Sequence, residues 1–291
     1  MYAKRNTMMN FFYAPAIVLF IIFVIVPFFE GVRISFTDWT GFLPDYRYVG
    51  LNNYIRFISD SEVLRVFINT VVYGFGSTIF QNIIGLAFAV YLNAKFRGRG
   101  IVRTIIYLPV MIAPLIMGYI MFYVLQYRSG ALNDLVMIFG AQAVDWLSTP
   151  TRTVLILTTI NTLQFVGVSM VIYLAGLQNI PKIYLEAADI DGASSIARFR
   201  HITFPLLLPA ITSSVVINLI GGLKLFDIIR ALTSVSPTTG AHSLSTYLTY
   251  QYFNVQRAGY AAVLGIFVFF FILIVNITVI RYFDRKEEKI L

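Results

Sequence analysis

Long apolar runs alternate with short polar connections along the whole chain, and six of the runs can each form a membrane-spanning helix. They cover approximately Phe11–Phe29, Val66–Leu92, Thr104–Leu125, Thr153–Leu174, Leu206–Leu223 and Tyr260–Ile280. A helix needs about 20 residues to cross the hydrocarbon core of a bilayer, and each run is close to that length. The runs are too long for barrel strands and lack their alternation of apolar and polar residues. The pattern therefore predicts an all-α membrane protein with six transmembrane helices.

The composition supports this class. Of the 291 residues, 58% are hydrophobic and 12% are charged, and the mean hydropathy is +0.77. Soluble domains are nearer half apolar and a quarter charged, so a soluble domain of this size is excluded. The chain has no cysteine, which excludes disulfides, thiolate zinc sites and cysteine nucleophiles. The first run can span the bilayer and has no small-residue cleavage site, so we expect no cleaved signal peptide.

Lysine and arginine are unevenly distributed between the two sides of the predicted membrane domain. With the N-terminus inside, 13 of the 22 cations fall within 63 residues of inner segments, namely 1–10, 93–103, 175–205 and 281–291. The other 9 are spread over 99 residues of outer segments, namely 30–65, 126–152 and 224–259. Cytoplasmic connections carry the excess of cations in membrane proteins, so we expect both termini in the cytoplasm. This arrangement also accounts for the net charge of +8 without nucleic acid as a partner.

We expect a single membrane domain, with no internal repeat. Residues 1–65 would hold the N-terminal tail, the first helix and an outer segment, and residues 66–283 would form the core with an inner loop at 175–205. Residues 284–291 would be a charged cytoplasmic tail. The outer segment 30–65 is rich in aromatic residues, which predicts a folded cap and not a linker. An aromatic belt at the membrane interface explains these residues as well as a role toward the substrate does.

None of the six runs contains Asp, Glu, Lys, Arg or His. Proton-driven transporters usually keep an ionisable residue within a span, so this absence argues against a proton-coupled symporter. No lysine follows a glycine, which excludes a phosphate-binding GxxxxGK[ST] loop. We expect no cofactor, and any ATPase that drives uphill transport must be a separate protein.

Several uncharged polar residues lie within the runs. The candidates for a substrate pathway are Asn161, Gln164, Phe165, Asn218 and Gly222, and Gln81 and Asn82 lie in the second run. A buried amide needs a partner, so each faces either another helix or a water-filled path. In one interpretation, these amides form hydrogen bonds between helices. Binding of the hydroxyls of a neutral sugar, with the Phe165 ring against the sugar face, is the other.

No catalytic or metal-binding constellation is visible. His201 and His242 are single and far apart in the sequence. Asp189 and Asp191 resemble an acid–base pair, but carboxylates at a helix end usually are solvated or cap the helix. We therefore expect a protein that is not an enzyme.

The inner loop 175–205 has a helix-turn-helix pattern. Pro181 suits the start of a helix, Lys182–Ile190 can form about two and a half turns, and Gly192 can end them. A second helical stretch follows from about Ser194 to His201, and Pro205 opens the next apolar run. Ala187 and Ala188 have small side chains that allow a close approach to another surface. The loop is therefore predicted to be a docking element for a partner.

The same loop resembles the EAA signature of bacterial binding-protein-dependent ABC importer permeases. The matching residues follow the spacing EAA-x3-G-x9-I-x-[LF]-P and are Glu186, Ala187, Ala188, Gly192, Ile202 and Pro205. Residues 35–39 and 49–54 are similar to the outer segment of the carbohydrate, maltose-type permeases. Phe204 replaces the usual Leu, and 234–237 departs from the Gly-rich turn of many relatives.

The resemblance implies a type I (MetI-like) importer membrane domain. A second permease subunit would pair with it in a heterodimer, two ATPase subunits would bind in the cytoplasm, and an external solute-binding protein would deliver a sugar. The loop, with Glu186 and Asp191 among its contact residues, would couple ATP hydrolysis to transport. The alternative is an ATP-independent secondary transporter or channel for a polar solute.

Overall fold

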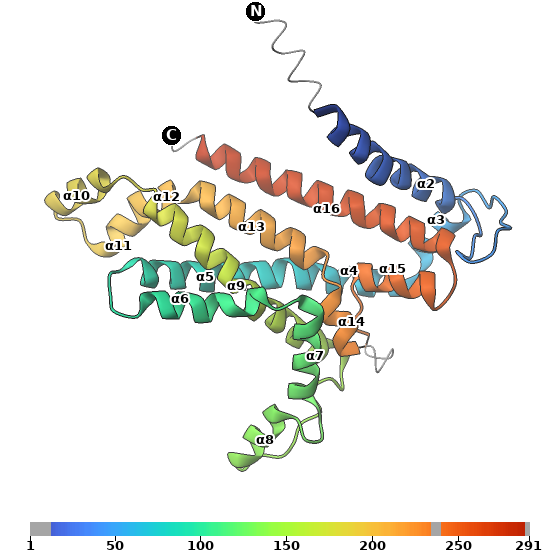
Figure 1. Ribbon diagram of the computed structural model, residues 1–291, viewed down its shortest axis with the longest axis horizontal. Coiled ribbons are helices and arrows are strands. Elements are labelled where there is room, and N and C mark those ends of the chain that lie inside the picture. Colours follow the sequence, from blue (N-terminus) through green and yellow to red (C-terminus); the bar gives the residue numbers. More distant parts are fainter. Residues whose placement is uncertain (1–12, 234–239, 289–291) are drawn as a thin grey trace, which may run out of the picture. The chain divides into compact units, whose positions relative to one another are not determined.

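The computed structural model describes residues 13–233 and 240–288. Within these residues the secondary structure is helical, apart from an isolated bridge between Thr37 and Tyr48. The all-α prediction is confirmed (Figure 1). The start of the first predicted run, the departure at 234–237 and residues 289–291 lie outside the described residues.

Among the described residues, four helices are long and apolar enough to cross a membrane. They are Tyr13–Ser35, Ser61–Asn93, Pro150–Gln178 and Ala258–Glu287. Two bent pairs raise the number to as many as six: Arg99–Met111 with Pro114–Leu125, bent by 97°, and Ser195–Leu206 with Leu208–Thr233, bent by 66°. Each predicted run falls in one of these six segments. The third run is not one straight helix, and the fifth begins just beside the other bend.

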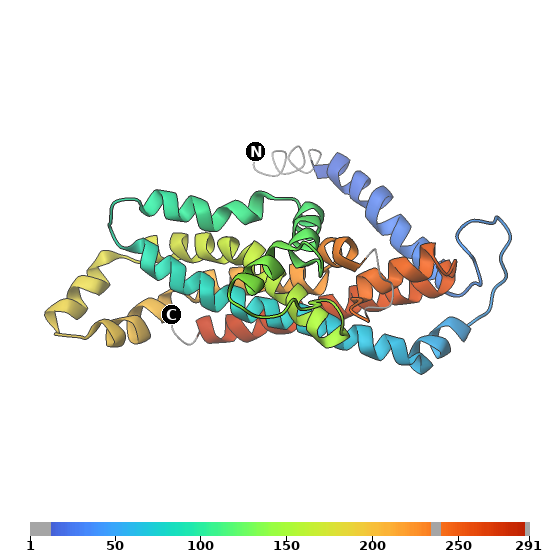
Figure 2. The same ribbon diagram turned by 90° about the horizontal axis from the view of Figure 1, so that it is seen from below.

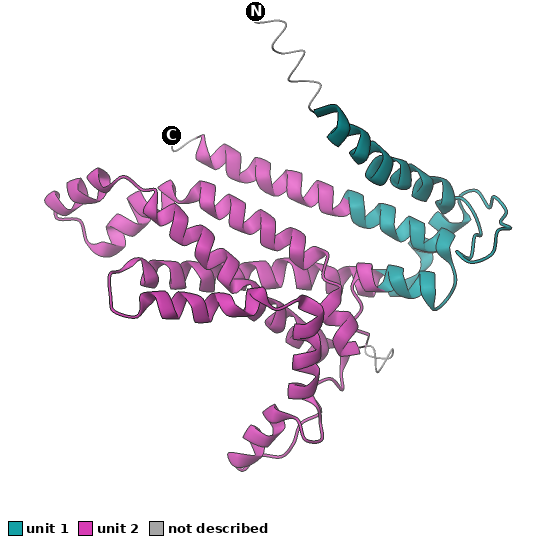
Figure 3. Ribbon diagram, viewed as in Figure 1, with its two compact units in different colours: residues 1–63, 247–270 teal, residues 64–246, 271–291 magenta. Residues whose placement is uncertain are grey.

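The chain divides into two compact units, and each is described separately (Figure 3). Unit 1 comprises residues 1–63 and 247–270, and unit 2 comprises residues 64–246 and 271–291. These units follow tertiary contacts. The division into 1–65, 66–283 and 284–291 remains a prediction.

Unit 1 contains the first apolar helix and the polar segment that follows it. Its elements are η1 (Ile21–Ile25), α2 (Val26–Ser35), α3 (Asn52–Ser59), the start of α4 (Ser61–Val71), most of α15 (Leu244–Phe253) and the first part of α16 (Ala258–Glu287). The Asn53 amide donates to the carbonyls of Ser35 and Thr37, at 2.9 and 2.8 Å. Residues 36–49 are therefore held as a folded cap.

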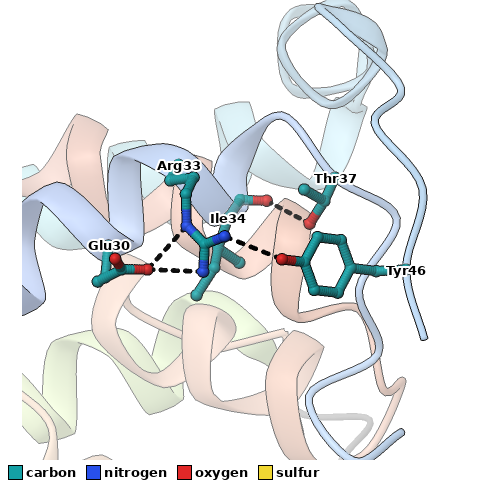
Figure 4. Close-up of polar contacts among 5 residues, drawn as sticks. All are labelled: Glu30, Arg33, Ile34, Thr37 and Tyr46. Atoms are coloured by element: carbon teal, nitrogen blue, oxygen red, sulfur yellow. Dashed lines mark hydrogen bonds and ion pairs between the residues drawn. The ribbon is translucent and has the colours of Figure 1, made fainter. Parts of the chain in front are cut away.

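A second set of contacts fixes the end of α2 (Figure 4). The Arg33 guanidinium forms an ion pair with Glu30 at 2.8 Å and donates to the Tyr46 hydroxyl at 2.9 Å. The Thr37 hydroxyl donates to the carbonyl of Ile34 at 2.8 Å. Because Tyr46 lies in the polar segment, these contacts join that segment to the helix before it.

Asp60 connects three helices of unit 1. Its Oδ2 accepts hydrogen bonds from the hydroxyls of Tyr247 and Tyr260, at 2.9 and 2.7 Å, and its Oδ1 accepts the backbone N–H of Glu62 at 3.0 Å. The last contact caps the start of α4. Burial alone raises the pKa of Asp60, but the bonds from Tyr260 and Tyr247 hold it below its ordinary value. Burial, followed by the bond to Asp60, raises the pKa of Tyr247 to about 12.

Unit 2 is a bundle built around one long helix. Its elements are the rest of α4, η2 (Val72–Gly76), α5 (Ser77–Asn93), α6 (Arg99–Tyr107), η3 (Leu108–Met111), α7 (Pro114–Leu125), α8 (Ala131–Ile138), α9 (Pro150–Gln178), α10 (Lys182–Ile190), α11 (Ser195–Arg198), η4 (Phe199–Thr203), α12 (Phe204–Leu206), α13 (Leu208–Leu223), α14 (Asp227–Thr233), the start of α15 and the second part of α16.

Helix α9 contributes to both hydrophobic clusters of the unit. Leu157 and Ile160 pack in one cluster with residues of α7 and α14, and Tyr173 and Leu177 pack in the other with residues of α5 and α13. Both views show α10 and α11 at the end where α9 stops and α13 begins, and α7 and α14 near the other end (Figures 1 and 2). The second cluster, which includes Leu177 and Ile180 of the loop 175–205, therefore connects this loop to the rest of unit 2.

Two of the crossings in this bundle depend on glycine. A Cβ at Gly222 of α13 would lie 2.9 Å from the Cα of Gly74 and from the carbonyl oxygen of Tyr73. A Cβ at Gly85 of α5 would lie 2.5 Å from the Cβ of Ser169 on α9. Small residues allow this approach of helix backbones within a membrane. Gly222, a candidate pathway residue, is therefore needed for a close helix contact.

We expect Asp60→Asn to lower the stability of unit 1 at neutral pH. The amide keeps the shape but replaces charge-assisted hydrogen bonds, which are each worth about 1.5–3 kcal/mol. Because the pKa is lower in the native state, the carboxylate stabilises the fold above its unfolded pKa of about 3.9, and this contribution disappears as the pH falls through the native pKa. Thermal unfolding in detergent should show a gap between wild type and variant at pH 7 that closes in acid. The matched control is Asp45→Asn, an exposed position in the same segment, and an equal shift in the control would contradict this role.

Candidate functional site

The loop 175–205 contains a short helix with a defined start and end. Helix α10 covers Lys182–Ile190, as predicted, and begins directly after Pro181. At its end the N–H of Ala193 donates to the carbonyl of Ala188 at 2.9 Å, and the N–H of Gly192 donates to that of Asp189 at 3.2 Å. These two bonds form a Schellman motif, with Gly192 in the left-handed conformation at φ +71°. Glycine is suited to this position because other residues rarely adopt such a φ angle.

A second short helical segment returns the chain to the bundle. Ser194 caps α11, because its hydroxyl accepts the N–H of Ala197 at 3.3 Å. Arg198 of α11 forms an ion pair with Asp189 of α10. This ion pair joins α10 to α11 across the turn. Asp189 therefore contacts another helix, in addition to any role as a solvated or capping carboxylate at the end of α10. The segment then continues through η4 into α12, where Pro205 lies in the first turn.

The two faces of α10 have different surroundings. Leu185 packs against the cluster around Tyr173, and Ala188 is 6% exposed. On the opposite face, Ile183 and Ile190 are 69% and 86% exposed. These isoleucines are seven residues apart, which is about two helical turns, so they lie on one face. The loop therefore presents an apolar surface away from its own bundle.

The predicted coupling residues divide between these surroundings. Glu186, Ala187, Asp191 and Gly192 are exposed, Ala188 is buried against its own chain, and Ile202 and Pro205 are half-buried. Of the two alanines, Ala187 is thus the one on the exposed side. Sequence reasoning missed the exposed isoleucines, including Ile196 at 81% exposed. The signal was available, because the spacing of Ile183 and Ile190 predicts a common face.

The candidate pathway residue Asn218 lies at a crossing of α13 and α9. Its amide donates to the Ser169 hydroxyl at 2.7 Å and to the carbonyl of Ser214 at 2.9 Å. Ser169 is the residue that Gly85 approaches from α5. Asn218 is 5% exposed, and its hydrogen bonds join two helices within the bundle.

Gln164 supports the bend between η3 and α7. Its Nε2 donates to the carbonyl of Ile112 at 2.9 Å. Ile112 has an extended backbone between the two helical segments, and Pro114 at the start of α7 lacks an N–H. A carbonyl freed at a helix break within a membrane needs another donor. Gln164, which is 1% exposed, supplies it from α9.

The remaining amides also make contacts between or within helices. Gln81 donates to the backbone carbonyl of Asn161 at 2.9 Å, which joins α5 to α9. Asn82 donates to the carbonyl of Thr78 at 2.7 Å and accepts a hydrogen bond from Tyr173. Phe165 is half-buried on α9. Hydrogen bonds between helices therefore account for several of these amides, and contact with a substrate remains a prediction.

Acidic and histidine side chains do not gather into a metal site within residues 13–233 and 240–288. His201 lies in η4, where its Nδ1 is 2.9 Å from the carbonyl oxygen of Ala197. His242 is far from it in the sequence, and the structure shows its Nδ1 at 3.2 Å from the hydroxyl of Thr246. The features that stand out in the described chain are thus the exposed face of α10 and the helix crossings beneath it.

Comparisons with known proteins place this arrangement in a family. The family model described as "binding-protein-dependent transport system inner membrane component" matches residues 81–289. The chain is 32% identical over 266 residues to the trehalose/maltose transport system permease protein MalF of Thermococcus litoralis, covering 91% of this chain and 89% of that protein. It is 33% identical over 279 residues to a probable starch degradation products transport system permease protein, AmyD of Thermoanaerobacterium thermosulfurigenes, covering 95% and 94%.

A solved structure shows the same fold. It is a crystal structure of a bacterial alginate ABC transporter in complex with an alginate pentasaccharide-bound periplasmic protein. The TM-score is 0.81 and the sequence identity 25%, and the match covers 99% of this chain and 96% of that chain. The chain is thus similar over nearly its whole length to the membrane component of an ABC importer.

We expect Gln164→Leu to destabilise unit 2. Leucine is similar in size but leaves the Ile112 carbonyl without its donor, at a cost of about 1–3 kcal/mol. The midpoint of thermal unfolding in detergent should fall. The matched control is Thr159→Val on the exposed side of α9, where the hydroxyl bonds within its own helix to Leu155. If both variants unfold at the wild-type temperature, Gln164 does not support the bend.

Proposed function

Because the chain belongs to the family of binding-protein-dependent transport system inner membrane components, we propose that it is the permease subunit of an ATP-driven importer that carries a carbohydrate, most simply an oligosaccharide, into the cell. Relatives named for the transport of trehalose and maltose, of starch degradation products and of multiple sugars support a sugar as the cargo. The six predicted apolar runs contain no Asp, Glu, Lys, Arg or His, which suits a neutral cargo.

The observation that carries this proposal is the exposed face of α10. A folded helix with Ile183 and Ile190 exposed on a polar loop is unfavourable in water unless a partner covers it. Between the two isoleucines in the sequence lie Glu186 and Ala187, both exposed, which supply a negative charge and a small side chain for contact with a partner. We therefore assign this face to an ATPase subunit in the cytoplasm, on the side where cations are concentrated.

Force on α10 would be transmitted through its buried side. Leu185 packs against the cluster of α5, α9 and α13, and the Schellman turn and the Asp189–Arg198 pair tie α10 to α11. Closure of two ATPase subunits would then move this end of unit 2 as a rigid body and change the access of the path. Glu186 would pair with a basic residue of the ATPase, and Ile202 and Pro205 would carry the motion into α13.

The remaining partners follow from the same assignment. A second, related permease subunit would complete the path, and a solute-binding protein outside the cell would deliver the sugar. The alginate transporter, whose crystal structure includes a periplasmic protein, supports this last partner. The path itself would lie beside α9 and α13, where Asn161, Gln164, Phe165, Asn218 and Gly222 would line it or fix its shape.

Uptake should require ATP and the partner subunits. Proteoliposomes would hold the chain with its second permease and ATPase subunits, with the binding protein outside and ATP enclosed. A labelled maltooligosaccharide should accumulate inside them, and a non-hydrolysable ATP analogue should abolish the accumulation. Uptake by the chain alone, without ATP, would instead support a secondary transporter or channel.

We expect Ile190→Asp to detach the ATPase while the permease remains folded. Burying an isoleucine side chain at an interface contributes about 1.5–3 kcal/mol, so retention of the ATPase on affinity-tagged permease should fall at least about tenfold. Ile190 is 86% exposed, so the change removes no contact within the chain. Ile58→Asp is the matched control, since Ile58 is 83% exposed on α3, in the predicted outer segment. Equal retention in both variants would remove α10 from the proposed interface.

A further inference from the structure

An apolar groove lies on the surface of unit 2 between η2–α5, α13 and α16. It has a volume of about 460 Å³, and most of the residues that line it are apolar. Phe75, Ile79 and Ile83 form one wall, Val215 and Leu219 form another, and Val279 and Phe283 form the third. Ile79 and Ile83 are exposed, so the described chain leaves this groove open.

A basic pocket adjoins the groove on α16. It has a volume of about 520 Å³ and is lined by Ile277, Thr278, Arg281, Tyr282, Arg285 and Lys286. Thr278 and Tyr282 line both cavities, so the two cavities are direct neighbours. The Lys286 ammonium lies over the Tyr282 ring, 4.7 Å from its centroid. The pocket thus combines three cations with a hydroxyl beside an apolar channel.

The acidic residues of the same helical turns do not line this pocket. Asp284, Glu287 and Glu288 are absent from its walls. The described residues form no ion pair between these carboxylates and Arg281, Arg285 or Lys286. The cations of α16 are therefore available to a ligand of opposite charge.

The two cavities differ in polarity in the way that the hydrocarbon core and the headgroup region of a bilayer do. The apolar run of this helix ends at about Ile280, and Arg281 is the first charged residue after it. Nine of the eleven residues that line the groove lie within the predicted apolar runs, and only Tyr282 and Phe283 lie beyond the boundary, whereas most of the basic pocket lies at the boundary or beyond it. Basic residues directly next to a span attract anionic lipid headgroups on the cytoplasmic leaflet.

We propose that α5, α13 and α16 bind an anionic phospholipid. Its phosphate lies between Arg281, Arg285 and Lys286, and one acyl chain occupies the groove along Ile79, Ile83 and Leu219. A free phosphate would use the cations but leave the groove empty. A helix of the second permease would use the groove but not the cations. A phospholipid is the occupant that uses both, and the proposal depends only on the membrane location of the chain.

The test measures lipid retained by the full chain after purification in detergent, by native mass spectrometry. The probes are palmitoyl-oleoyl phosphatidylglycerol and palmitoyl-oleoyl phosphatidylcholine, added in equal amounts. The first variant is Arg281→Gln/Arg285→Gln/Lys286→Gln, and the second is Ile79→Trp, which fills the groove with the cations intact. The matched control, Lys95→Gln/Arg97→Gln/Arg99→Gln, removes the same charge from another predicted cytoplasmic segment.

We expect the wild type and the control to retain phosphatidylglycerol over phosphatidylcholine. The triple α16 variant should bind at least about tenfold less phosphatidylglycerol, since each cation near the surface favours anionic lipid by about fivefold. Ile79→Trp should also reduce binding, which a site for free phosphate would not show. Equal retention by the triple variant and the control, or equal binding of both lipids, would overturn the proposal.

The assembled importer provides a second, independent test. The chain has no cysteine, so Ile83→Cys introduces a single attachment point for a photoreactive maleimide in the groove. Cross-linking to phosphatidylglycerol in the complete complex supports the proposal. Cross-linking to the second permease subunit in place of lipid shows that protein covers the groove, and would overturn it.

Discussion

Every backbone carbonyl or N–H that leaves a helix within the apolar part of this chain must find another partner, because a bilayer offers no water to replace it. Buried amide side chains supply such partners, both at a helix break in an apolar run and in the connecting loops. Gln164 satisfies the Ile112 carbonyl at the break before α7, and Asn69 donates to the carbonyls of Gly240 and His242 at 2.9 and 3.0 Å. Asn133 bonds both the carbonyl and the N–H of Val144. A buried amide therefore holds the break at Ile112, and two others hold the connecting loops at residues 240–242 and at Val144.

This constraint changes how polar residues in apolar runs should be interpreted. From the sequence alone, Asn161, Gln164 and Asn218 suit helix contacts, which are the commoner role of such amides, and also sugar hydroxyls. The structure gives Gln164 and Asn218 partners on neighbouring helices or at the bend, so these two amides have a role in folding whether or not a sugar also contacts them. Fixing a bend and fixing a path are compatible, because a path between helices exists only while their crossings are maintained.

Local sequence patterns predicted where helices form, but they did not predict which helix faces are exposed or where an apolar run is broken. The bounds of α10 agree with the pattern, because proline and glycine mark its two ends chemically. The break at Ile112 was missed, because hydropathy averages over Pro114 within a uniformly apolar run. The division of α10 into a buried and an exposed face needed tertiary contacts. Ala187 and Ala188 are chemically equal in the sequence, and only the packing of Leu185 and Ala188 onto the bundle separates them.

The packing around Tyr173 links the two surfaces that we assign to partners. Leu185 of α10 and Phe283 of α16 both pack against the same buried cluster, together with Leu86 of α5. Interiors of this kind transmit displacement because they are close-packed and deform little. If an ATPase shifts α10 as we propose, the shift would displace side chains next to the groove formed by α5, α13 and α16. A molecule that occupies the groove and makes the cluster more rigid would also stiffen the connection between α10 and the membrane-embedded helices. Force can be transmitted by rigid-body motion only if this connection is stiff.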